Sequence, residues 1–367
     1  MNNDTFAQRY LAGPAVHRDR RTAERCAVNA VSYHLDPRRG LDGLNAKPQA
    51  VPVPGPDQVV VRVRAASLNR RDLMLMDGTY PLPASPGVVP LSDGVGEVIA
   101  MGDNVTRASV GDRVTASYFV RWIDGPQRFA HVVEQYGANH DGMLATYAVL
   151  EQDSVVHVPA HLSDAEAATL TCAGVVAWAA LTTPEPVRTG QPVLVVGTGP
   201  VALFAIQHAR AFGAGVIVVT STPAKAERLR AMGVDEVIVS AEYPDWDQRV
   251  RSLTGGDGVD RIVDAVGMPT LPKSVRSGAY NAELTLIGAS PGPAPIEGDG
   301  NPFGGGYLSI RRIAVGSRTQ FEAMNEAMSK HGIRPVLDRI FSLEQAVEAY
   351  RYYRDANPFG KVVVGMP

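Results

Sequence analysis

The chain has 367 residues, 45% hydrophobic and 20% charged, and a formal net charge of −3 at pH 7. At roughly 100–200 residues per domain this length predicts two domains, and the composition excludes a disordered chain. Two cysteines, Cys26 and Cys172, are too few for a disulfide framework or a structural zinc site. No apolar run reaches the roughly 18–20 residues of a membrane span, residues 1–25 lack an apolar signal core, and basic residues are not in excess. We therefore expect a cytoplasmic protein with no membrane or nucleic-acid partner.

The first 160 residues divide into an extension and a strand-rich domain. Residues 1–25 are polar without a hydrophobic period, which predicts either a solvated tail or an arm that caps a partner. From residue 26 to 160, short apolar or alternating runs are separated by Gly and Pro, as is typical of a small β-rich domain. Its expected strands are Ala27–Tyr33, Gln58–Ala65, Gly94–Met101, Arg113–Ser117 and Met143–Leu150.

Residues 161–318 alternate between strand and helix patterns. The expected strands are Val193–Val196, Val216–Val219, Glu236–Val239, Arg261–Val266, Glu283–Ile287 and Arg312–Val315. The expected helices are Val201–Phe212, Pro223–Met232, Asp245–Leu253, Leu271–Ala279 and, after the last strand, Gln320–Lys330. This order predicts an α/β fold with a doubly wound, parallel, six-stranded sheet of the Rossmann type. Residues 319–367 are too few to fold alone, so we expect them to return to the first domain and make it discontinuous.

A glycine-rich turn joins the first of these strands to its helix. Gly197 permits a tight turn, Gly199 lets the backbone approach a pyrophosphate, and Ala202 replaces the third glycine of the dinucleotide fingerprint. The amino terminus of the helix offers unpaired N–H groups to the anion. The predicted cofactor contacts in this turn are Gly197, Thr198, Gly199, Pro200 and Val201.

The end of the second strand carries hydroxyls and a lysine where NAD-specific sites usually carry a carboxylate. These groups can bind a ribose 2′-phosphate through charge-assisted hydrogen bonds, which predicts NADP(H) in preference to NAD(H). The predicted contacts are Thr220, Ser221, Thr222 and Lys225, with Arg228 as a further cation. The alternative is that Thr222 only caps the helix while both cations face solvent.

Seven motifs together resemble the medium-chain dehydrogenase/reductase superfamily over essentially all of the chain after residue 25. They are Ser67–Leu73, Gly78–Pro81, Pro90–Val98, Gly111–Val114, Leu170–Trp178, the glycine turn and Gly360–Val364. The resemblance implies a GroES-like β-rich catalytic domain beside a Rossmann domain, assembled as a homodimer or homotetramer. It also implies an NAD(P)H-dependent oxidoreductase that acts on a small molecule.

Within this superfamily, the zinc-dependent alcohol dehydrogenases carry Cys, His and Cys where this chain has Asn69, Ser92 and Cys172. Because two of these three ligands are absent, the chain is similar to the zinc-free, quinone-oxidoreductase-like branch, and we expect no metal. Residues 119–142 match the structural-zinc region and contain no cysteine. An improvised metal site is the alternative to surface or packing roles, and its candidate ligands are His131, His140, Asp141 and Cys172.

In that branch, hydride passes between the nicotinamide and an activated C=C of an enone, quinone or enoyl group, or a carbonyl. The developing enolate needs only a hydrogen-bond or proton donor. Tyr80 is the predicted donor, because the segment before it resembles the stretch in which enoyl-thioester reductases carry a catalytic Tyr. Asn69 is the second predicted catalytic residue. The alternatives are packing on Pro81 for Tyr80 and local turn bonding for Asn69.

The remaining site residues follow from their positions in the resemblance. Cys172, Asp93 and Asp72 are predicted to line the substrate pocket, with packing or turn bonding as alternatives. The further predicted cofactor contacts are Val266, Gly288 and Lys361, with Arg318 as a second basic candidate for the pyrophosphate. The Gly/Pro-rich segment 289–307 is either a substrate lid or a surface insertion.

Two other functions stay open at this level. One is a metal-free alcohol dehydrogenase or ketone reductase, and the other is a non-catalytic NADPH-binding sensor. The stretch from Asn69 to Tyr80, beside an intact glycine turn, argues against the sensor. The substrate itself does not follow from the sequence, because one fold hosts many chemistries.

Overall fold

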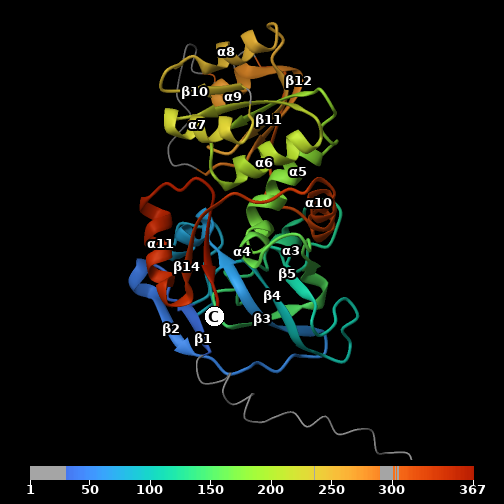
Figure 1. The fold of residues 1–367 in the computed structure, drawn as a ribbon, viewed down its shortest axis with the longest axis vertical. Coiled ribbons are helices and arrows are strands. Elements are labelled where there is room, and N and C mark those ends of the chain that lie inside the picture. Colours follow the sequence, from blue (N-terminus) through green and yellow to red (C-terminus); the bar gives the residue numbers. More distant parts are fainter. Residues whose placement is uncertain (1–29, 235, 290–300, 302, 304–305) are drawn as a thin grey trace, which may run out of the picture.

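The computed structural model describes residues 30–367 except 235, 290–300, 302, 304 and 305. Two lobes are stacked along the long axis of the molecule, one built on a seven-stranded sheet and the other on a six-stranded sheet (Figure 1). The predicted extension 1–25, Cys26 and most of the predicted lid 289–307 lie outside the described residues. Within the described part of the chain, no helix combines the length and the apolar character needed to cross a lipid bilayer.

The first lobe combines strands and short helices from both ends of the described chain. Its elements are β1 (Val31–Leu35), η1 (Gly40–Gly43), β2 (Leu44–Pro48), β3 (Gln58–Ser67), α2 (Arg70–Met76), β4 (Asp93–Met101), β5 (Arg113–Ala116), α3 (Phe129–Val132), β6 (Tyr147–Glu151), η2 (Gln152–Ser154), β7 (Val155–His157), β14 (Leu337–Ser342), η4 (Leu343–Gln345), α11 (Ala346–Asp355) and β15 (Lys361–Gly365). The strand order is β14-β15-β3-β4-β5-β7, and β6 also pairs with β3. Because β15 pairs antiparallel with β3, the end of the chain completes this sheet, which confirms the predicted discontinuous β-rich domain.

The second lobe is the predicted doubly wound sheet. Its elements are the π-helix η3 (Leu170–Gly174), α5 (Val175–Thr182), β8 (Pro192–Val196), α6 (Pro200–Ala211), β9 (Gly215–Thr220), α7 (Pro223–Ala231), β10 (Glu236–Val239), α8 (Trp246–Leu253), β11 (Val259–Asp264), α9 (Leu271–Ser277), β12 (Gly278–Leu286) and β13 (Ser309–Arg312). Helix α4 (Asp164–Ala167), which precedes η3, packs on β3, β4 and β15 of the first lobe. All six strands are parallel, in the order β10-β9-β8-β11-β12-β13. Along β8, Val193 and Val195 pack in the core that includes α6, while Leu194 and Val196 pack in the core that includes α8 and α9. Helices therefore cover both faces, as continuous apolar strands require.

Several strand boundaries differ from the sequence-based expectation, and two of them have a clear cause. The last strand of the parallel sheet is Ser309–Arg312 rather than Arg312–Val315, because the chain turns at Val315, which has φ +52°. Strand β6 begins at Tyr147 rather than Met143. Met143 instead donates its backbone N–H to the Leu91 carbonyl in an irregular segment. Met143 and Val315 are buried without belonging to the expected ladder, so hydrophobicity alone misplaced these strand ends.

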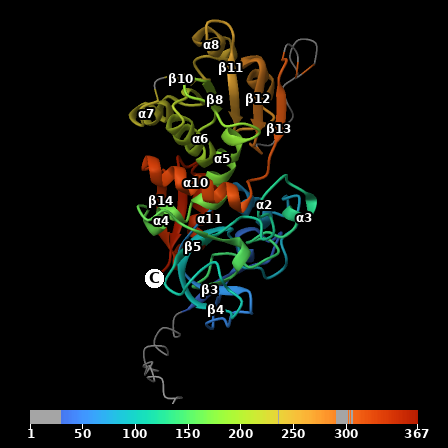
Figure 2. The same ribbon diagram turned by 90° about the vertical axis from the view of Figure 1, so that its right-hand side faces the viewer.

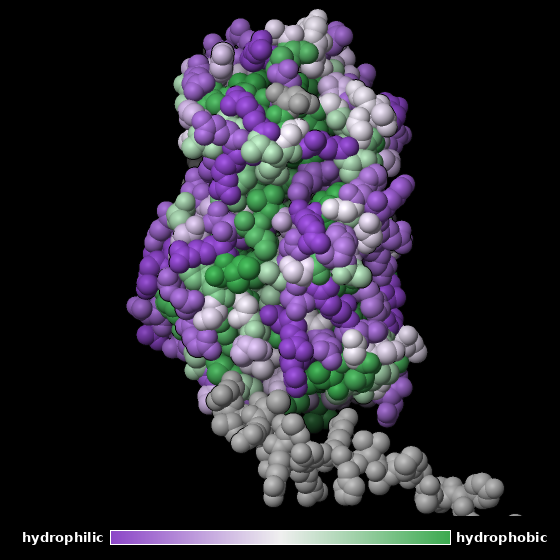
Figure 3. Space-filling view, viewed as in Figure 1, coloured by the Kyte–Doolittle hydropathy of each residue, from purple (hydrophilic) through white to green (hydrophobic). Residues whose placement is uncertain are grey.

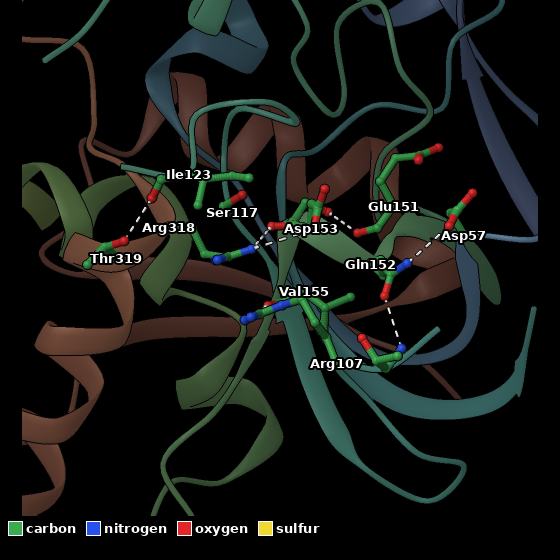
Figure 4. Close-up of polar contacts among 12 residues, drawn as sticks. Asp57, Arg107, Ser117, Ile123, Glu151, Gln152, Asp153, Val155, Arg318 and Thr319 are labelled. Atoms are coloured by element: carbon green, nitrogen blue, oxygen red, sulfur yellow. Dashed lines mark hydrogen bonds and ion pairs between the residues drawn. The ribbon is translucent and has the colours of Figure 1, made fainter. Parts of the chain in front are cut away.

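Helix α10 (Arg318–His331) lies between the two sheets in both ribbon views (Figures 1 and 2). Its first residues bond to the first lobe: Arg318 N donates to the Trp122 carbonyl at 3.0 Å, and Thr319 Oγ1 donates to the Ile123 carbonyl at 2.9 Å (Figure 4). The Arg318 guanidinium donates to the Asp153 carbonyl at 2.6 Å, which places it at this boundary, and its predicted contact with a pyrophosphate stays a prediction. On the face of Figure 1, apolar side chains gather along the middle of the molecule, where the lobes meet (Figure 3).

Candidate functional site

The glycine turn follows β8, the strand from which the strand order of the parallel sheet runs in both directions. Such switch points are where open α/β sheets bind ligands. Gly197 has φ +105°, and a Cβ there would lie 3.1 Å from Val266 Cγ2, so both backbone conformation and space favour glycine. A Cβ on Gly199 would meet nothing within 4 Å, and α6 begins at the next residue. The space beside Gly199 therefore leaves room for a pyrophosphate at the amino terminus of α6, and the predicted contact itself stays a prediction.

The ends of β11 and β12 close on this turn. Gly288 follows β12, and a Cβ there would lie 2.0 Å from the Val266 carbonyl carbon, so only glycine fits. Asp264, the last residue of β11, accepts hydrogen bonds from Val266 N at 3.0 Å, from Gly267 N at 2.9 Å and from Ser274 Oγ at 2.7 Å. Burial raises the pKa of this carboxyl. Asp264 was not among the predicted site residues, and its one signal in the sequence was its place as a carboxylate at the end of an apolar strand.

The second strand ends in the predicted group of hydroxyls and cations. Thr220 is buried, and its hydroxyl has no hydrogen-bond partner among the described residues. Thr222 caps α7 by accepting from Lys225 N at 3.4 Å. The Lys225 side chain is half-buried, and burial together with the neighbouring Arg228 lowers the pKa of its ammonium. Capping and a cation pair therefore coexist here, and residues 220–225 include no carboxylate.

Asn69 and Asp72 form a capping box at the start of α2. Asn69 N donates to Asp72 Oδ2 at 2.7 Å, so both predicted residues also serve the local turn. Burial raises the pKa of the Asp72 carboxyl to about 6. Helix α2 begins the stretch from Asn69 to Tyr80, which resembles the active-site segment of the family. The cap therefore fixes the backbone that leads to Tyr80.

A buried ammonium lies beside Asn69. Lys361, from β15, donates to Asn69 Oδ1 at 2.7 Å and to the Leu68 carbonyl at 2.9 Å, and its Nζ lies 3.4 Å from Asp93 Oδ2. Lys361 is 1% exposed and Asp93 is fully buried. All three acceptors belong to the first lobe, so the structure gives this ammonium a role there, and its predicted contact with a pyrophosphate stays a prediction.

Asp93 connects this ammonium to the other two positions that match zinc ligands. It accepts from Ser92 Oγ at 2.8 Å and from Cys172 N at 3.2 Å. Asn69 therefore binds the Lys361 ammonium directly, while Ser92 and Cys172 donate to Asp93, the carboxylate next to that ammonium. Burial and the nearby Asp93 raise the pKa of the Cys172 thiol to about 12, so the thiol is protonated at neutral pH.

The four candidate ligands of the alternative metal site do not form a cluster. His131 stacks on Trp122 with ring centroids 6.3 Å apart, His140 Nε2 lies 3.8 Å from Glu134, and Asp141 accepts from Val89 N at 2.9 Å. Across the described residues, no group of three or more His, Cys, Asp or Glu side chains is arranged to hold a metal ion.

Tyr80 is half-buried and hydrogen-bonded. Its hydroxyl lies 3.0 Å from Tyr118 Oη and 3.3 Å from Gln135 Oε1, and the Arg71 guanidinium carbon lies 5.5 Å from the centre of its ring. The structure therefore surrounds the predicted donor with polar groups in addition to any packing on Pro81. The sequence analysis missed Tyr118, Gln135 and Arg71. Arg71 lies in the Ser67–Leu73 motif, whereas no motif or local sequence pattern singles out Tyr118 or Gln135.

Comparisons with known proteins agree with this arrangement. Residues 55–160 match the model of an alcohol dehydrogenase GroES-like domain, and residues 200–330 match that of a zinc-binding dehydrogenase. A zinc-type alcohol dehydrogenase-like protein (C1773.06c) of Schizosaccharomyces pombe is 37% identical over 334 residues, covering 89% of this chain and 96% of the relative. An acryloyl-coenzyme A reductase of Sulfurisphaera tokodaii is 30% identical and covers 85% of this chain and 93% of its own length. The crystal structure of a quinone oxidoreductase from Pseudomonas syringae pv. tomato DC3000 superposes with a TM-score of 0.75 at 26% identity, covering 92% of this chain and all of that one.

Proposed function

The chain belongs to the medium-chain dehydrogenase/reductase superfamily of NAD(P)H-dependent oxidoreductases, and on this premise we propose that it works with NADP(H) and without zinc. Its proposed reaction is hydride transfer to an activated C=C of an enone, quinone or enoyl type, or to a carbonyl, in a small organic substrate. The observation that carries the proposal is the buried ammonium of Lys361, 2.7 Å from Asn69 Oδ1.

The ammonium supplies a positive charge among the residues that match the zinc ligands of the alcohol dehydrogenases. A zinc ion beside it would meet a like charge in a buried, weakly screened environment. Zinc also needs thiolate, imidazole or carboxylate ligands, whereas Asn69 and Ser92 offer an amide and a hydroxyl, which leaves Cys172 as the one good ligand among the three matching positions. This donor set does not fit a catalytic zinc ion.

The second lobe fits a nicotinamide dinucleotide. The open backbone at Gly199 and the start of α6 would hold the pyrophosphate, and Asp264 fixes the turn that contains Val266. When bound, the reduced nicotinamide supplies a hydride. The chain's own part is to exclude water and to place a proton, and the half-buried hydroxyl of Tyr80 is the proposed donor to the enolate.

Specificity for NADP(H) is proposed on the end of β9. A ribose 2′-phosphate would accept from the unpaired hydroxyl of Thr220 and offset the repulsion between Lys225 and Arg228. Arg228 Nη1 lies 3.9 Å from Asp338 Oδ1, so one carboxylate already shares this charge. The net charge at this point of the sheet still favours the phosphorylated cofactor.

A homodimer or homotetramer is also proposed, with β13 as the interface strand. This strand is at the edge of the six-stranded sheet, and Ile310 on it is 36% exposed. The adjacent rings of Tyr280 and Tyr307 stack on each other and are exposed. Pairing of two such edges about a two-fold axis would satisfy the free backbone groups and cover the rings. A cytoplasmic location stays a prediction.

The experiment that tests the reaction is NADPH oxidation by the purified protein against a panel of an enone, a quinone, an enoyl thioester, an aldehyde and a ketone. Faster turnover of the first three supports the proposal. Turnover of only the aldehyde or ketone indicates the metal-free alcohol dehydrogenase instead. Tight NADPH binding without oxidation by any member of the panel indicates a sensor.

A further inference from the structure

The hydrogen bonds around Tyr80 have a defined direction. Gln135 Nε2 donates to the Val132 carbonyl at 2.8 Å, which directs its Oε1 towards the Tyr80 hydroxyl at 3.3 Å. An amide oxygen only accepts, so Tyr80 donates to Gln135. The Tyr118 hydroxyl, 3.0 Å away, must then donate to the Tyr80 oxygen. A second phenol is therefore already oriented to stabilise negative charge on Tyr80.

The buried guanidinium of Arg71 lies close to the rings of both Tyr80 and Tyr118. The Arg71 guanidinium carbon is 4.5 Å from the centre of the Tyr118 ring and 5.5 Å from that of Tyr80. Arg71 is 5% exposed and donates to the Tyr136 carbonyl at 3.0 Å, and two of its nitrogens have no hydrogen-bond partner among the described residues. A cation this close stabilises negative charge on the Tyr80 oxygen more strongly in a buried site than in water. Burial raises the pKa of Tyr118 well above its ordinary value, so Tyr118 stays a neutral hydrogen-bond donor.

The charge of Arg71 is retained. Burial opposes it, but the neighbouring Tyr118 and Asp72 raise the pKa of the guanidinium. The other titratable groups that face this cluster are Asp72, from the same helix, Cys172, from η3, and Tyr350, from α11, whose pKa is raised by burial. Cys172 stays neutral, because the pKa of its thiol is about 12. Asp72 is the one carboxylate that opposes an anion here.

We propose that Tyr118 and Arg71 are positioning residues that make Tyr80 an effective acid by stabilising the tyrosinate it becomes. The inference rests on the proposed function. The reduced nicotinamide would supply the hydride by losing one of its own C–H bonds and being oxidised, and a new C–H bond would form at the β-carbon. The C=C electrons shift to the bond beside the carbonyl carbon, and the carbonyl π pair moves onto the substrate oxygen. The enolate then returns an electron pair to a new C–H bond at the α-carbon, with the proton from the Tyr80 O–H. Tyr80 is left as a tyrosinate that accepts from Tyr118 Oη beside the Arg71 charge, and water later restores its proton.

The direct test needs no substrate. Near-ultraviolet absorbance at a fixed alkaline pH, taken as the difference between a protein and its Tyr80→Phe counterpart, reports the tyrosinate at position 80 alone. We expect less tyrosinate in Tyr118→Phe and in Arg71→Met, and a partial recovery in Arg71→Lys. Tyr136→Phe is the matched control, because it removes another buried phenol, bonded to Ser154 Oγ at 2.9 Å, and should leave the signal unchanged. Equal tyrosinate in the wild type and Tyr118→Phe overturns the inference.

Turnover gives a second readout. A hydrogen bond to a charged group contributes enough for Tyr118→Phe to lower kcat roughly 10- to 100-fold, with KM and NADPH affinity nearly unchanged. The solvent deuterium isotope effect should rise in the same variant, because proton transfer becomes the slower step. Wild-type protein that oxidises no member of the substrate panel contradicts the proposed function but leaves the tyrosinate test standing. Normal turnover with an unchanged kcat in Tyr118→Phe contradicts the inference alone. Since Tyr118→Phe is nearly isosteric, it keeps the test valid if Arg71→Met fails to fold.

Discussion

Lys361→Met tests the buried ammonium on which the zinc-free proposal depends. Methionine keeps most of the side-chain volume but removes the charge and its bonds to Leu68 and Asn69. Among the described residues, Asp93, which is fully buried, would keep Ser92 Oγ and Cys172 N as its donors. Removing one partner of a buried ion pair typically costs about 3–5 kcal/mol, because the remaining charge is left without compensation. We expect a loss in the free energy of unfolding within that range, measured by urea denaturation at pH 7.

Two further variants make the result specific. Lys361→Met combined with Asp93→Asn should recover a large part of the loss, because the second change removes the uncompensated charge. Arg64→Met is the matched control for a surface pair, because Arg64 and Glu97 are 37% and 46% exposed at their side chains, and it should cost less than about 1 kcal/mol. A Lys361→Met protein that unfolds within about 1 kcal/mol of the wild type would refute the reasoning.

Three other predictions follow from the described contacts. Burial lowers the pKa of His208 to about 3, so between pH 6.5 and 5 only the unfolded chain takes up this proton, and stability falls as the pH falls. Over that pH interval the free energy of unfolding of His208→Leu should therefore fall by about 2 kcal/mol less than that of the wild type in urea titrations. Equal decreases in the two proteins would contradict a buried neutral imidazole. Lys225→Ala should weaken NADPH binding about 10-fold and leave NADH binding nearly unchanged in fluorescence titrations, whereas an equal loss for both cofactors would remove the 2′-phosphate argument. Ile310→Lys on the β13 edge should shift the native mass towards the monomer in light scattering, and an unchanged oligomer would place the interface elsewhere.

The parts of the fold that could be predicted are those with a local cause. The glycine turn, the Thr222 cap of α7 and most apolar strands of the second lobe are specified by residues a few positions apart, and each was found at or near its predicted place. Lys361 lies 292 positions from Asn69, and Tyr118 lies 38 positions from Tyr80, so no local period or spacing indicates either pair. Asp264 was missed for a different reason, because a carboxylate at a strand end has the same local pattern whether it faces solvent or organises a turn. Val315 shows the opposite error, in which an apolar residue suggested a strand although the backbone turns there.

The central claim is that the chain transfers hydride without zinc. The most direct measurement is NADPH oxidation with an activated alkene by protein purified in the presence of a chelator, with the zinc content of the same sample determined by elemental analysis. We predict full activity at far less than one zinc per chain and no increase when zinc is added. Stoichiometric zinc that survives purification, or activity that appears only after zinc is restored, would contradict the account.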